Sequence, residues 1–185
     1  MIIHGIRLEI DFSFLIFTAV IFLLRDSSII LGFFAVSTLH ELGHGLALYA
    51  AGGRIGLLSL WGMGIKMQPE RGLILTVKEE AAVLLAGPLS NLLLYGAVQL
   101  TAGECLFGYM NLAAAVFNLL PYGMLDGGSL LDLLQDHSVY RIIGTILKLF
   151  ISVGLFAACI LTDRDFFIPF CVSAIYLLRD IIIER

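Results

Sequence analysis

The sequence predicts an all-α membrane protein of about six transmembrane helices, with a small membrane-associated β-hairpin between the second and the third. Of the 185 residues, 59% are hydrophobic and only 14% are charged, whereas about one quarter of a soluble domain is usually charged. Apolar runs of near-span length recur along the chain, and short polar or glycine-containing breaks separate them. Each run is expected to be helical, because a helix satisfies its own backbone hydrogen bonds in lipid.

These runs give six predicted spans, since a span needs roughly 20 apolar residues, and fewer where protein flanks it. The first is short and ends at Arg25 and Asp26. No small-residue cleavage pattern follows it, so we expect a retained helix rather than a signal peptide. The predicted spans are residues 10–24, 29–51, 79–101, 105–121, 140–161 and 166–183.

Residues 52–78 interrupt this pattern. Gly56, Gly62 and Gly64 stand among the apolar residues of 55–67, and a turn-forming run at 68–72 precedes β-compatible residues at 73–77. Glycine-rich turns between β-compatible runs indicate a hairpin. We predict that this hairpin lies against the membrane face, and a plain connecting loop is the alternative.

The basic residues favour one orientation in the membrane. With six spans, both termini share one side with the 52–78 and 122–139 regions, and that side carries eight Lys and Arg residues against two on the other. Basic residues concentrate on the cytoplasmic side of membrane proteins. We therefore expect a multi-pass protein of a bacterial cell membrane with both termini in the cytoplasm. The net charge of −4 and the lack of a polybasic run give no indication of nucleic-acid binding.

The most specific motif is His40-Glu41-Leu42-Gly43-His44, which lies inside an apolar run where ionisable residues are costly. On a helix, positions i and i+4 share one face, so His40 and His44 can bind one ion together. The expected ion is zinc, one Zn²⁺ per chain, because a catalytic zinc site uses imidazoles among three protein ligands and keeps a place for water. Glu41 can take a proton from that water as the catalytic base. The alternative is a pair of packed histidines without a metal.

Asp126 is the strongest candidate for the third ligand. Pro121 and the neighbouring glycines break the helix there, and a broken backbone at membrane depth is tolerated where it lines a cavity. The second and fourth spans run in the same direction, which puts His44 and Asp126 near their cytoplasmic ends. We therefore expect the active site toward the cytoplasm, although Asp126 could instead cap a helix. The remaining candidates are His4, His137, Asp132 and Asp136.

Taken together, these segments resemble the site-2 protease family of intramembrane zinc metalloproteases, over about residues 36–130. The chain matches three motifs of that family: HExxH at His40, Glu41 and His44; N-x-x-P-x-x-x-x-D-G at Asn118, Pro121, Asp126 and Gly127; and G-P-x-x-N at Gly87, Pro88 and Asn91. The compact arrangement of spans is most similar to the sporulation-type branch, the stage IV F-B-like proteases.

The resemblance implies that residues 1–185 form a single integral membrane metalloprotease domain with a catalytic core at about 29–130. It implies zinc bound by two histidines and an aspartate, and regulated intramembrane proteolysis of a membrane-spanning protein. The expected partners are that substrate, the lipid bilayer and a regulatory membrane protein. Asn118 and, more weakly, Asn91 are candidates for positioning the substrate or its developing oxyanion. Interhelical hydrogen bonding is the alternative for both.

Hydrolysis inside a membrane requires local unwinding of the substrate helix. An exposed sheet edge can hold an extended peptide by main-chain hydrogen bonds, so the predicted hairpin is a candidate substrate clamp. Two other functions stay open. A metal-ion transporter would need polar residues through both halves of the membrane, whereas here they concentrate at one depth. A catalytically inactive binding protein is disfavoured by the presence of Glu41.

Overall fold

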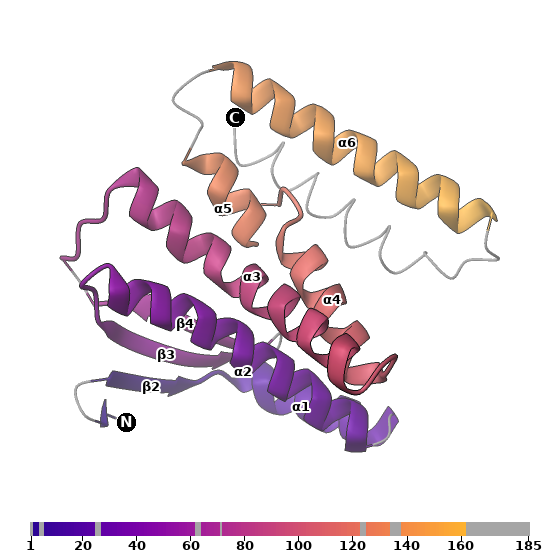
Figure 1. Cartoon of the computed structure of the whole chain (residues 1–185), viewed down its shortest axis with the longest axis horizontal. Coiled ribbons are helices and arrows are strands. Elements are labelled where there is room, and N and C mark those ends of the chain that lie inside the picture. Colours follow the sequence, from indigo (N-terminus) through magenta and orange to yellow (C-terminus); the bar gives the residue numbers. More distant parts are fainter. Residues whose placement is uncertain are drawn as a thin grey trace. The chain divides into compact units, whose positions relative to one another are not determined.

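A computed structural model of the chain describes residues 2–3, 6–24, 27–61, 64–70, 72–122, 125–133 and 138–161. The described residues form six helices and four strands. The chain divides into two compact units, residues 1–117 and 118–185. Figure 1 labels the elements, and each unit is described by itself.

The first unit contains a four-stranded sheet of β1 (Ile2–Ile3), β2 (Ile6–Ile10), β3 (Ile55–Trp61) and β4 (Gly64–Pro69), in that spatial order. The β1–β2 and β3–β4 pairs are antiparallel, and β2 lies parallel to β3. A hairpin is therefore present between the second and third helices as β3 and β4, but the predicted turn was misplaced. Residues 68 and 69 belong to β4, and the β-compatible residues 73–77 form no strand.

The all-α prediction was incomplete at the N-terminus, because β1 and β2 extend the hairpin into a mixed sheet. Residues 6–10 read Ile-Arg-Leu-Glu-Ile, an alternation of apolar and polar side chains that is typical of a half-buried strand. Ile10 belongs to β2, so the first helix begins later than predicted. Arg7 and Glu9 form an ion pair of 2.8 Å (Nε to Oε1), and both side chains are largely exposed.

Four helices complete the first unit: α1 (Phe12–Leu24), α2 (Ser27–Ala50), α3 (Val77–Thr101) and α4 (Leu106–Asn118), whose last residue already belongs to the second unit. Their positions agree with the first four predicted runs to within a few residues. The Ser13 backbone N–H donates to Asp11 Oδ1 at 2.8 Å at the start of α1. Hydrogen bonds from the side chain and the backbone of Ser13 hold the pKa of Asp11 below its usual range.

The start of α3 is fixed by a capping box. The Glu79 N–H donates to Thr76 Oγ1, and the Thr76 N–H donates to Glu79 Oε2 at 2.8 Å. Such a reciprocal pair satisfies two backbone donors that a helix N-terminus otherwise leaves without a partner. The helix that carries the Gly87-Pro88 segment therefore has a defined first turn.

The second unit contains α5 (Asp126–Asp132) and α6 (Ser138–Leu161). Helix α6 corresponds to the predicted span 140–161, and the predicted span 166–183 lies outside the described residues. The hydroxyl groups of Tyr122 and Ser152 lie 3.5 Å apart and are buried. A β-carbon on Gly127 would collide with the Leu119 and Leu120 carbonyl groups, so the residue after Asp126 must be glycine.

Among the described residues, one helix, α3, is both long and apolar enough to cross a membrane. Helix α4 and residues 144–154 of α6 are shorter apolar segments. Five of the six predicted spans therefore correspond to helices of the described residues, and the prediction is not confirmed as six membrane crossings.

Candidate metal centre

Helix α2 brings the two motif histidines together on one face, as their spacing predicts. The His40 side chain is buried and the His44 side chain is half-buried. Their Nε2 atoms lie 3.1 Å apart, and the two rings meet edge to face with centroids 4.7 Å apart. The pair therefore presents two imidazole nitrogens toward one point.

The opposite ring nitrogens are both hydrogen-bonded, which determines the tautomers. His44 Nδ1 lies 2.7 Å from the Val83 carbonyl oxygen, and His40 Nδ1 lies 2.6 Å from Asn91 Oδ1. Carbonyl and amide oxygens only accept hydrogen bonds, so each Nδ1 carries the proton and donates it. In these tautomers the lone pair of each ring is at Nε2, which is the arrangement that metal-binding histidines adopt.

This arrangement fits a zinc ion. Two imidazole nitrogens at about 2.0–2.1 Å from a tetrahedral zinc ion would be about 3.3 Å apart. The Nε2 atoms of His40 and His44 are separated by 3.1 Å, close to that value. Two lone pairs at this distance repel each other, and a cation between them removes that repulsion.

The Gly-Pro segment of α3 gives the imidazoles room. A β-carbon on Gly87 would collide with His44 Nε2 and would lie only 2.8 Å from His40 Cε1. Pro88 is fully buried inside α3 and has no backbone N–H. On the facing helix, a β-carbon on Gly43 would lie 2.6 Å from the Ala86 carbonyl oxygen. These glycines allow α2 and α3 to approach closely, as small residues do at helix interfaces in membranes.

The carboxylate of Glu41 lies against the last strand of the described sheet. Glu41 Oε2 accepts a hydrogen bond of 2.9 Å from the Met67 backbone N–H, and Ser37 Oγ accepts one of 3.3 Å from the Ile65 N–H. Ser37 and Glu41 are four residues apart on α2, and Ile65 and Met67 are two residues apart on β4. The outward edge of β4 therefore faces the helix that carries the histidines, and α2 packs against β4 and α3 (Figure 1).

The other predicted site residues lie as follows. Asn91 is fully buried on α3 and contacts His40. Asn118 ends α4, and Asp126 is the first residue of α5, so Leu125 rather than Asp126 occupies the helix-cap position. Asn118 and Asp126 belong to the second unit, and their side chains are half-buried. Asp132 is exposed, and the candidates His4, Asp136 and His137 lie outside the described residues.

Four contacts of this site were not predicted from the sequence. They are made by Ser37, Met67, Val83 and Asn111. Val83 and Met67 contribute backbone atoms, for which no side-chain signal exists. Asn111 could have been noticed, because it is an amide inside the otherwise apolar run 105–121.

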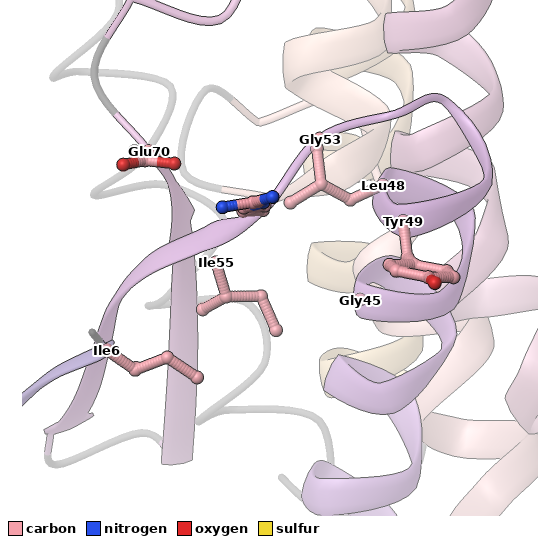
Figure 2. A pocket seen from close by; sticks show the side chains of 8 residues that line it. Ile6, Gly45, Leu48, Tyr49, Gly53, Ile55 and Glu70 are labelled. Atoms are coloured by element: carbon pink, nitrogen blue, oxygen red, sulfur yellow. The ribbon is translucent and has the colours of Figure 1, made fainter. Parts of the chain in front are cut away.

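A pocket of about 430 Å³ lies near this site but does not include it. Figure 2 shows it between the helix that carries Leu48 and Tyr49 and the strands that carry Ile6 and Ile55. On α2 its lining begins at Gly45, directly after His44, and the pocket is lined by neither motif histidine nor Glu41. The pocket is therefore a neighbouring hollow of the first unit rather than the metal centre.

Sequence comparison finds two relatives of known description. The chain is 36% identical over 104 residues to stage IV sporulation protein FB of Bacillus subtilis, which covers 52% of this chain and 36% of that protein. It is 32% identical over 111 residues to a Synechocystis protein named as a predicted zinc metalloprotease, covering 53% of this chain and 28% of that protein. The matched segment thus spans about one third of each relative's length. No model of a known protein family matches the chain.

Structure comparison finds the same fold in the site-2 protease from Methanocaldococcus jannaschii. The TM-score is 0.62, and the match covers 96% of this chain and 90% of that structure. Sequence identity over the match is 21%, so this likeness concerns the fold.

Proposed function

Because the chain belongs to the site-2 protease family, we propose that it is an intramembrane zinc metalloprotease that hydrolyses peptide bonds of membrane-spanning proteins. The observation that carries the proposal is the histidine pair on α2, whose Nε2 atoms face each other at 3.1 Å while both Nδ1 atoms donate elsewhere. We further propose that the chain acts in a bacterial cell membrane, with both termini and the active site on the cytoplasmic side.

His40, His44 and Asp126 would hold one Zn²⁺ per chain, each with one donor atom of a kind that zinc accepts. The proposal for Asp126 rests on its motif, on its position at the start of α5 and on the glycine that must follow it. Bound zinc would polarise the scissile carbonyl group and make the attacking water more acidic.

Glu41 would act as the general base. It follows His40 directly, so its carboxylate points about 100° around α2 from the first histidine and does not need to ligate the metal. The Met67 N–H holds Oε2 on the side of α2 that faces β4. A carboxylate oxygen of Glu41 would take the proton of the attacking water and return it to the leaving amine.

The edge of β4 is our proposed substrate clamp. The Ile65 and Met67 amides point outward from the sheet, and their present acceptors are the Ser37 and Glu41 side chains of α2. A substrate segment in extended form can replace such acceptors with its own carbonyl oxygens. A peptide bound there would run beside the proposed base, which is the geometry that hydrolysis of an unwound helix requires.

Asn118 stays a proposed contact for the substrate.

The proposal can be tested with Glu41→Gln. First, the membrane protein that accumulates uncleaved in cells carrying this variant is identified by quantitative proteomics. That protein is then reconstituted in liposomes with the purified wild-type chain or with Glu41→Gln. We expect cleavage by the wild type only, with equal zinc content in both. Equal cleavage would reject Glu41 as the base, and zinc flux into the liposomes without cleavage would favour a transporter.

A further inference from the structure

A series of three hydrogen bonds, two of them buried and one part-buried, leads from α4 to the first histidine. Asn111 Nδ2 donates to the Phe107 carbonyl oxygen at 2.9 Å, and Asn91 Nδ2 donates to Asn111 Oδ1 at 2.9 Å. Asn91 Oδ1 then lies 2.6 Å from His40 Nδ1. Both asparagines are fully buried, and His40 is 6% exposed. All of these residues belong to the first unit.

The donor-to-acceptor direction of these hydrogen bonds is fixed at Asn111, the residue farthest from His40. A backbone carbonyl oxygen only accepts, so Asn111 must turn its amide nitrogen to Phe107 and its oxygen to Asn91. Asn91 must then turn its own nitrogen to Asn111, which leaves its oxygen for His40. His40 Nδ1 must therefore carry a proton and donate it to Asn91 Oδ1, and the lone pair of the His40 ring is at Nε2.

Asn91 has a full set of partners only in this arrangement. Asn91 uses both amide protons, toward Asn111 Oδ1 and toward the Val36 carbonyl oxygen at 3.4 Å, and its oxygen accepts from His40. A His40 tautomer with its proton on Nε2 would place two acceptors 2.6 Å apart. A buried polar group without a partner is costly, so the amides disfavour that tautomer.

We propose that Asn111 and Asn91 are positioning residues that hold His40 in the tautomer and orientation in which Nε2 binds the metal. This inference deepens the proposed function and rests on His40 being a ligand. His44 needs no such residues, because the Val83 backbone carbonyl orients it. Hydrogen-bond partners behind metal-bound histidines typically change metal affinity by about 10–100-fold when they are removed.

The first test uses the full-length wild-type chain in detergent, labelled with ¹⁵N-histidine, before and after zinc is added. Nitrogen chemical shifts distinguish a protonated ring nitrogen from an unprotonated one, and the His40 signals are identified by their loss in His40→Gln. We expect the proton on Nδ1 in both states. A proton on Nε2 of His40 in the zinc-free chain would overturn the proposal.

The second test compares Asn111→Leu with Gln99→Leu. Both variants remove a side-chain amide, but Gln99 bonds to Tyr95 on its own helix and does not contact His40. We expect Asn111→Leu to weaken zinc binding about 10–100-fold, measured by competition with a chelator. We also expect it to give a mixture of His40 tautomers, while Gln99→Leu changes neither. If a folded Asn111→Leu keeps the zinc affinity and the His40 tautomer of the wild type, the proposed positioning role is refuted.

Loss of folding is distinguished from loss of positioning by circular dichroism. If Asn111→Leu does not fold, Asn111→Ala replaces it, because the smaller side chain leaves space that a water molecule can fill. We expect the same direction of change with a smaller magnitude. A wild-type chain that binds no zinc would instead contradict the proposed function, and the tautomer measurement would still report on the asparagines.

Discussion

The substitution Gly87→Ala tests the packing of the histidine pair against α3. A β-carbon at this position would lie 2.8 Å from His40 Cε1 and still closer to His44 Nε2. Ordinary contact begins at 3.4 Å, so His40 would have to move by at least 0.6 Å and His44 by more. Metal–ligand distances tolerate deviations of about 0.2 Å. We therefore expect zinc affinity to fall by at least about 100-fold, the upper range for a change behind the ligands.

Gly96→Ala on the same helix is the matched control. A β-carbon at Gly96 meets no atom within 4 Å, and alanine is favoured over glycine in a helix interior by about 1 kcal/mol. Gly96→Ala should therefore keep its zinc and its stability. Gly87→Ala also places a β-carbon before Pro88, which disfavours helical backbone at that position. Circular dichroism of the zinc-free chains separates this backbone effect from the loss of metal.

The assay is the zinc content of the purified chains, measured by elemental analysis over a series of chelator concentrations. Proteolysis is followed in parallel and should fall by roughly 100-fold or more, since a ligand displaced by about 1 Å can cost that much. Full zinc content and unchanged cleavage in Gly87→Ala would refute the packing argument. Equal losses in Gly87→Ala and Gly96→Ala would show that the clash with the histidines is not the cause.

Three further predictions follow from the site. Asp126→Asn should reduce zinc content well below one ion per chain, and full zinc content would remove Asp126 from the ligand set. Met67→Pro removes the amide that donates to Glu41 and should reduce cleavage without loss of zinc, while Met67→Ala, which keeps that amide, should cleave nearly as the wild type does. Equal cleavage by the two Met67 variants would contradict the proposed clamp. Treatment with 1,10-phenanthroline should stop cleavage, and added Zn²⁺ should restore it; continued cleavage by the metal-free chain would contradict metal-dependent hydrolysis.

The positions of the helices were predictable because they depend on local composition. Apolar runs bounded by charges or glycines gave α2, α3 and α6 to within a few residues. The strands β1 and β2 were missed, although residues 6–10 alternate as a strand does. The parallel pairing of β2 with β3 joins segments separated by α1 and α2, and no local pattern encodes such a contact.

Only part of the candidate site was predictable from the sequence. The i, i+4 spacing of His40 and His44 was enough to predict that their rings would meet. The atoms that orient these rings were not predictable, because the Val83 carbonyl oxygen and the Asn91 amide reach them only through the packing of α2 against α3. Asn91 was considered as a contact for the substrate, and its burial against His40 supports a role in positioning the ligand instead.

X-ray absorption at the zinc edge of the purified chain would test the metal centre most directly. We expect one zinc per chain with two imidazole nitrogens and oxygen ligands at about 2.0–2.1 Å, and the signal of one imidazole should disappear in His44→Ala. A chain that binds no zinc, or a zinc ion with sulfur ligands at about 2.3 Å, would contradict a metal centre built on His40 and His44.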